Sequence, residues 1–177
     1  MRTSWITLVF AAILLTGCGD LPSLEGLANK ENTVFDPALL GTWSTAESVI
    51  VVKAGDDQSY RIHWLDLDDD ATPVLQMEAR LVKLGEQRIL DLSSSNPGAF
   101  AIPCHVFLRI RPVKEGLKVQ FVDSLWIREK AKTTLTNFVW EKHPVLTAPS
   151  AQIATFLQKF GFDEQALDEP MLFRRLR

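Results

Sequence analysis

Few residues of this sequence have the types and spacing that catalysis or metal binding needs. Cys104 and His105 form the one obvious nucleophile–base pair, but neighbouring residues of a strand point to opposite faces, so these two would not meet. His63, His105 and His143 lie about forty residues apart, without the short spacing of a zinc motif. The sequence therefore predicts a protein that is not an enzyme and holds no metal.

An acidic stretch, Asp66-x-Asp68-x-Asp70, could supply the alternate carboxylates of a calcium loop. Such a loop would need glycine and glutamate where this chain has Ala71 and Met77, so we interpret the stretch as a solvated hairpin turn. The sequence also lacks the glycine-rich motifs that hold phosphates or dinucleotides and the Gly-x-Ser-x-Gly motif of hydrolases. No cofactor is expected.

Aromatic residues make a better case for ligand binding. Tryptophan and tyrosine give a pocket both apolar area and a polar tip, which small-ligand sites prefer. The alternative is that these side chains fill the core, and the sequence leaves both interpretations open. The candidates are Trp43, Tyr60, Trp64, Phe107, Phe121 and Trp126.

Short runs in which apolar and polar residues alternate dominate the chain after Leu40, which is the pattern of antiparallel strands. Apolar residues spaced three and four apart predict a helix that is capped by Thr147 or Ser150 and ends at Gly161. A shorter helix is expected after Asp123 or Ser124. Strands are expected at residues 41–44, 49–53, 60–65, 74–84, 88–92, 104–112, 117–123 and 171–176, and residues 138–140 and 145–146 are expected to be extended. About eight strands with a late helix predict a mainly β, antiparallel fold: a closed or partly closed barrel with a C-terminal helix.

The N-terminus has the pattern of an export signal, since Arg2 precedes an uncharged apolar run over residues 5–15. At about 1.5 Å per residue, this run is too short to cross a hydrocarbon layer about 30 Å thick. The residues that follow, Leu15-Thr16-Gly17-Cys18, resemble the lipobox of bacterial lipoproteins. The resemblance implies cleavage before Cys18 and acylation of its thiol. Because Gly19 follows the cysteine, it also implies the outer membrane, facing the periplasm, in a Gram-negative source.

The chain divides into three parts on this reasoning. Residues 1–17 are the signal peptide, residues 18–36 are a lipidated N-terminus and flexible tether, and residues 37–177 are a single domain. The whole chain, with 46% hydrophobic and 23% charged residues, has an ordinary globular composition. Acylation of Cys18 leaves Cys104 without a partner in its own chain, so we expect Cys104 in the core. An intermolecular disulfide or a reactive thiol is the alternative.

The start and the end of the expected barrel resemble a known family. Leu40-Gly41-Thr42-Trp43 is similar to the Gly-x-Trp of the first lipocalin strand, and a late helix precedes a strand that would return beside it. On these residues the chain resembles lipocalin-like (calycin) bacterial lipoproteins. The resemblance implies that Trp43 seals the floor of the barrel under Arg174 or Arg175, in a cation–π contact.

Charge and architecture leave two leading hypotheses for the function. An enzyme is the third alternative, which a cleft with converging Asp, Glu and His side chains from separate strands would support. A net charge of −3 gives no basic face for nucleic acid. The first hypothesis is a membrane-anchored binding module that holds a small apolar ligand or lipid in its barrel. The second is a structural or assembly lipoprotein that grips a periplasmic protein partner and has no ligand cavity. Because an eight-stranded barrel can be filled by side chains or hold one ligand, its interior volume separates them.

Overall fold

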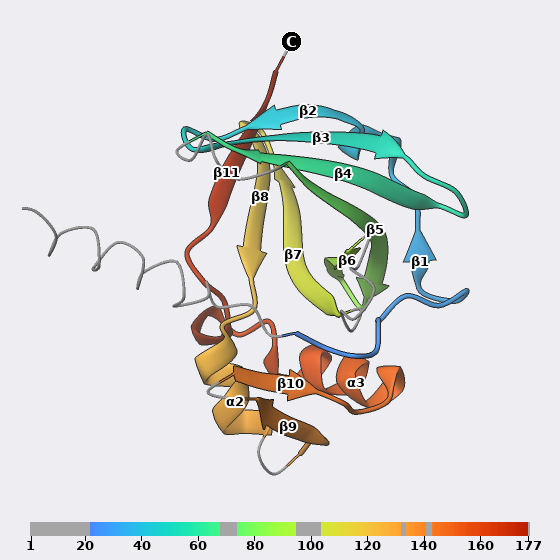
Figure 1. Cartoon of the computed structure of the whole chain (residues 1–177), viewed down its shortest axis with the longest axis vertical. Helices are drawn as coiled ribbons and strands as arrows, with labels where there is room; N and C mark the ends of the chain where they lie inside the picture. Colours follow the sequence, from blue (N-terminus) through green and yellow to red (C-terminus); the bar gives the residue numbers. More distant parts are fainter. Residues whose placement is uncertain (1–21, 68–73, 95–103, 132–133, 141–142, 177) are drawn as a thin grey trace, which may run out of the picture.

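The computed structural model of the 177-residue chain describes residues 22–67, 74–94, 104–131, 134–140 and 143–176. Eight antiparallel strands form a closed barrel (Figure 1). In chain order they are β2 (Gly41–Ser44), β3 (Ser48–Ala54), β4 (Ser59–Asp66), β5 (Leu75–Leu84), β6 (Gln87–Ser94), β7 (His105–Val113), β8 (Gly116–Phe121) and β11 (Met171–Arg175). The pairing of β11 with both β8 and β2 closes the ring. A short additional strand, β1 (Thr33–Val34), pairs with β5. The mainly β barrel with a C-terminal helix is confirmed.

Period-two alternation separates an inside from an outside along each strand. On β7, Leu108 and Ile110 point into the barrel, whereas Phe107 and Arg109 lie on its outer wall. The turn into β8 needs glycine, since Gly116 has φ of 152° and a Cβ there would lie 2.1 Å from the carbonyl oxygen of Phe173. The apolar side chains that point inward form what we call the inner core.

One end of the barrel, the floor, is sealed. The 3-10 helix η1 (Pro37–Leu39) lies there, and its buried Leu39 accepts a 2.9 Å hydrogen bond from the indole nitrogen of Trp43. The Arg175 guanidinium lies 5.3 Å from the Trp43 ring centroid and donates to the Leu40 carbonyl. The predicted contact between Trp43 and an arginine of the last strand is therefore confirmed, with Arg175 as the partner.

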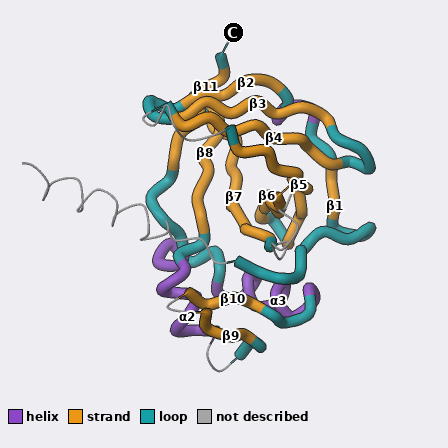
Figure 2. The backbone as a smooth tube through the Cα atoms, viewed as in Figure 1, coloured by secondary structure: helices purple, strands orange, loops and turns teal. Residues whose placement is uncertain are grey.

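The residues between β8 and β11 form a layer outside the barrel, and we call this the C-terminal layer. Its elements are α2 (Ser124–Ala131), β9 (Asn137–Trp140), β10 (His143–Leu146), α3 (Ser150–Phe160) and the 3-10 helix η2 (Glu164–Ala166). Figure 2 shows α2 and α3 in this layer, outside the ring of strands. Asp123 caps α2 by accepting from the amide of Trp126 at 2.7 Å. The expected cap of α3 is wrong, because Pro149 precedes the helix and no side chain caps it.

A second apolar cluster, the outer core, lies between the barrel wall and the C-terminal layer. Its buried side chains include Val82, Ile89 and Phe107 of the wall and Ile153, Phe156 and Leu157 of α3. The spacing of the α3 residues places them on one face of the helix. Arg109 and Gln120 are also buried on the outer wall, where the arginine donates to the Gln120 side-chain oxygen at 2.6 Å.

Residues 22–34, which we call the strap, begin between the barrel and the C-terminal layer and continue along the side of the barrel to β1 (Figure 1). Ser23 exchanges two backbone hydrogen bonds with His105, at 2.9 and 2.7 Å, and the amide of Leu24 donates to Leu146. Further along, the carbonyl of Asn32 accepts from the amide of Lys83 in β5. The described part of residues 18–36, which we expected to be a flexible tether, is thus hydrogen-bonded to the barrel and to β10. The polar composition of these residues does not indicate that they pair with strands distant in the sequence.

Candidate functional site

The interior of the barrel is filled with side chains. The cavity left inside has a volume of about 30 Å³, and the residues that line it are all uncharged. Such a volume corresponds to about one water molecule, and an apolar cavity of this kind stays dry. A ligand of ordinary size therefore has no room inside the barrel, and the expectation of a ligand held there is not met.

The opposite end from the floor, which we call the mouth, carries a larger hollow. It has a volume of about 400 Å³ and lies where β4 and β6 end and β5 and β7 begin. Its apolar lining comes from Trp64, Leu75, Met77, Leu92, Val106 and Phe121, with Cys104 among them. These residues share the inward face of their strands, so the hollow continues the inner core outward.

Large apolar side chains are exposed on the rim of this mouth hollow. Leu65, Leu67, Val74 and Leu75 are 38%, 46%, 45% and 52% exposed, and all four flank the connection between β4 and β5. Neighbouring apolar residues that face water in this way mark a site of contact with a ligand, a partner or a membrane. Together with the hollow, they make the mouth the candidate binding surface.

The six predicted aromatic residues do not meet in one cavity. Trp64 and Phe121 line the mouth hollow, and Trp64 makes an edge contact with Phe173 at 5.7 Å between ring centroids. Tyr60 is fully buried in the inner core, where its hydroxyl bonds the backbone of Asp36 next to the floor. Trp43 belongs to the floor itself.

The other two aromatic residues lie outside the barrel. Phe107 is buried in the outer core, and Trp126 of α2 packs against that core and against Phe160, with ring centroids 6.5 Å apart. Phe107 points away from the interior because it alternates with Val106 and Leu108 along β7. Neither residue can reach a ligand at the mouth hollow.

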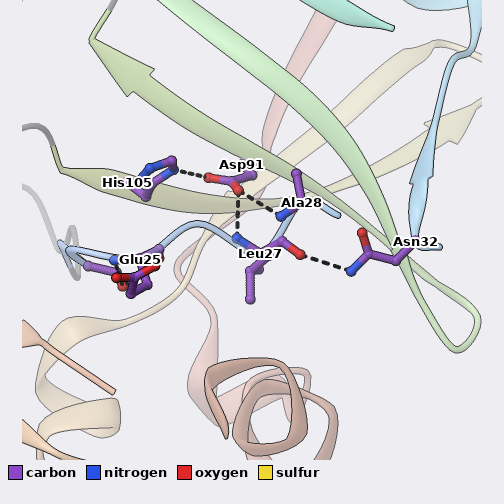
Figure 3. A network of polar contacts seen from close by, with 7 residues as sticks. Glu25, Leu27, Ala28, Asn32, Asp91 and His105 are labelled. Atoms are coloured by element: carbon purple, nitrogen blue, oxygen red, sulfur yellow. Dashed lines mark hydrogen bonds and ion pairs between the residues drawn. The ribbon is translucent and has the colours of Figure 1, made fainter. Parts of the chain in front are cut away.

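A polar cluster that sequence reasoning missed lies on the outer wall. Figure 3 shows the Asp91 carboxylate of β6 between the imidazole of His105 and the strap. One carboxylate oxygen lies 2.6 Å from His105 Nδ1, and the other accepts from the amides of Leu27 and Ala28 at 2.7 and 3.1 Å. Asp91 is buried, with 3% of its side chain exposed. We call this arrangement the clamp, because it fastens the strap to the barrel.

The electrostatics of the clamp favour a charged imidazole. The hydrogen bond that the imidazole donates to Asp91 raises the pKa of His105 above its ordinary value of 6.5, and this effect outweighs burial, which lowers the pKa. An acid inside the apolar run Ile89–Leu92 was the one signal in the sequence, since a buried carboxylate needs partners. The pairing itself joins residues far apart in the chain.

The clamp also borders a cleft of about 240 Å³ between the strap, the wall and the start of α3. Glu25, Glu78 and Arg80 line it with the hydroxyl side chains of Ser93 and Ser150. An imidazole oriented by a buried carboxylate resembles the base of a catalytic triad. The Asp91 carboxylate also accepts from two strap amides, so the contacts that the structure shows support a role in fastening the strap.

The remaining sequence candidates are scattered. Cys104 is half-buried at the mouth, and not in the core as expected, while His105 points to the outer wall as the strand pattern predicted. Cys18 and positions 68–70 of the acidic stretch lie outside the described residues. Among the residues that are described, no group of histidine, cysteine and acidic side chains is placed to hold a metal.

Comparisons of the chain with models of protein families, with curated proteins and with solved structures found no match. In the described ranges, the helices are all too short or too polar to cross a membrane.

Proposed function

We propose that the protein is a membrane-anchored envelope lipoprotein that binds a small apolar ligand or lipid, and that it does so at the mouth hollow. The observation that carries the proposal is the contrast between two volumes. The barrel interior leaves about 30 Å³, whereas the mouth hollow offers about 400 Å³ with an apolar and aromatic lining. Ligand sites are typically concave and mostly apolar, which the hollow satisfies.

The anchor is supported by the N-terminal sequence. The charged start, the apolar run and Leu15-Thr16-Gly17-Cys18 follow the order of a lipoprotein signal, and Gly19 after the cysteine favours the outer membrane. Two or more acyl chains would hold the chain stably on a bilayer. Growth with a radioactive fatty acid tests this step: the wild-type chain should be labelled, and a Cys18→Ala chain should not. An unlabelled wild-type chain would refute the anchor.

Ligand binding is tested with the chain from Gly19 onward and a fluorescent fatty acid. Leu75→Asp places a carboxylate on the lining of the hollow, at a side chain that is 52% exposed, so the fold should tolerate it. We expect affinity to fall by at least about tenfold, since a buried unpaired charge is costly. Leu176→Asp is the matched control, because Leu176 is 49% exposed beside the floor strand β11. Equal affinities for both variants would contradict the proposal.

The second hypothesis, a protein partner gripped by the barrel, also has an observation in its favour. The exposed rim side chains Leu65, Leu67 and Val74 could insert into a partner, and a filled barrel suits a rigid scaffold. A photoreactive amino acid at position 67, compared with one at position 176, tests this in intact envelopes. A reproducible protein crosslink from position 67 alone would favour the partner over the ligand.

A further inference from the structure

The strap limits how far the barrel can move from its anchor. Three residues separate Cys18 from Pro22, where the described chain begins. Even fully extended, the steps from position 18 to position 22 span at most about 14 Å. The inference below therefore rests on the proposed anchor at Cys18.

The strap is held too tightly to add length by peeling away. Ser23 is 0% exposed and Leu27 is 1% exposed, and the clamp binds the strap through two amides. Gly26 packs so closely that a Cβ there would lie 2.7 Å from the His105 ring and 2.8 Å from Asp91. The anchor and the barrel wall therefore stay close to each other.

The strap also begins beside the mouth. Ser23 pairs with His105, the first residue of β7, and the preceding Cys104 lines the mouth hollow. The rim leucine Leu75 lines the same hollow, and Leu67 is exposed just beyond the end of β4. One end of the barrel, the mouth, thus has the start of the strap, the short spacer that joins it to the anchor, and the exposed apolar rim.

We infer that the rim of the mouth lies against the bilayer that holds the anchor, with Leu67, Val74 and Leu75 at the boundary of headgroups and acyl chains. An apolar surface beside a lipid anchor buries its exposed area there, as interfacial apolar faces do. The exposed acidic residues Glu47 and Asp66 neighbour these leucines. The surface thus fits a zwitterionic bilayer better than an anionic one.

The test uses the full acylated chain in vesicles of phosphatidylethanolamine and phosphatidylcholine. A nitroxide is attached at Leu75→Cys or, as the control, at Leu176→Cys, each in a Cys104→Ser background. The readout is the accessibility of the label to a water-soluble nickel chelate. A second version of each chain carries about ten Gly and Ser residues between Gly19 and Asp20, which adds about 18 Å of average reach.

We expect the label at position 75 to be about fivefold less accessible in the chain with the short spacer than in the lengthened chain. The label at position 176 should be equally accessible in both. Vesicles with added phosphatidylglycerol should increase accessibility at position 75, because like charges repel. Equal accessibility at position 75 with short and long spacers would overturn the inference.

Failure of the bilayer contact can be distinguished from failure of the proposed anchor or ligand site. Loss of fatty-acid labelling would refute the anchor, and equal affinities of Leu75→Asp and Leu176→Asp would refute the ligand site. An acylated chain that binds the fluorescent fatty acid but leaves position 75 open to the chelate would refute the bilayer contact alone.

Discussion

The two cores of this protein are built in different ways. The inner core is made of apolar side chains from strands that are neighbours in the barrel, and its residual cavity is lined by uncharged residues. The outer core joins the strap, the barrel wall and the C-terminal layer, and buried polar residues such as Asp91, Arg109 and Gln120 lie on the same side of the wall. The difference indicates that alternation along strands suffices for the first core, whereas the second needs specific polar contacts.

The largest effect is expected inside the barrel. Phe173 is fully buried and packs edge-on against Trp64, so Phe173→Ala should lower the free energy of unfolding by about 3–5 kcal/mol. The inner core cannot refill this space without moving strands. Urea unfolding followed by tryptophan fluorescence measures the loss. A loss below about 1 kcal/mol would mean that the barrel adapts, which contradicts a closely packed interior.

The second-largest loss of stability is expected when the clamp beside the outer core is removed. Asp91→Ala leaves the amides of Leu27 and Ala28 without their acceptor, which should lower the free energy of unfolding by about 2–3 kcal/mol. Asp91→Asn is the matched control, since its side-chain oxygen can still accept from the strap, and it should lose less. Amide hydrogen exchange at Leu27 and Ala28 should accelerate in the alanine variant. Unchanged exchange would show that the strap is held without the clamp.

A smaller effect is expected from the pH dependence of the stability that His105 contributes through the clamp. Because the pKa of His105 is raised in the folded state, its contribution to stability is complete below about pH 6.5 and is lost as the pH rises through the raised value. We therefore expect the stability difference between the wild-type chain and His105→Gln to shrink as the pH rises from about 6. Urea midpoints across this range provide the measurement. A difference that grows with pH would reverse the assigned sign.

The smallest effect is expected at the floor. Arg175→Gln removes the cation over Trp43 and should cost about 0.5–1 kcal/mol, since the arginine is exposed. Arg174→Gln is the control, because Arg174 is also exposed and no cation–π contact involves it in the described structure. Thermal unfolding of both variants resolves the difference. Equal losses would assign the effect to net charge instead of the contact with Trp43.

The inner core could largely be predicted from the sequence. Strands such as β3, β4 and β7 begin and end within one or two residues of the expected bounds, because period two is a local signal that needs no partner. The contact between Arg175 and Trp43 followed from the resemblance at the first strand. Filling of the interior could not be predicted, since the volume depends on how side chains from opposite strands interlock.

The outer core and the clamp could not be predicted in the same way. Asp91 and Leu27 are 64 positions apart, and the donor is a backbone amide, which leaves no trace in residue type. Of the candidate aromatic residues, Trp64 and Phe121 lie at the mouth because they follow the inward alternation. Phe107 follows the outward alternation of the same pattern, and the sequence alone did not reveal that a second core covers it.

Closure of the ring by β11 has a consequence for how the chain folds. The Arg175 side chain and the Leu40 carbonyl that it contacts are 135 positions apart, so the first and last barrel strands meet only after β11 has been made. Until then β2 and β8 each present an unpaired edge, which is prone to aggregation. Contacts of such long range also slow folding. A chaperone that shields strand edges would therefore act on this protein late, just before the barrel closes.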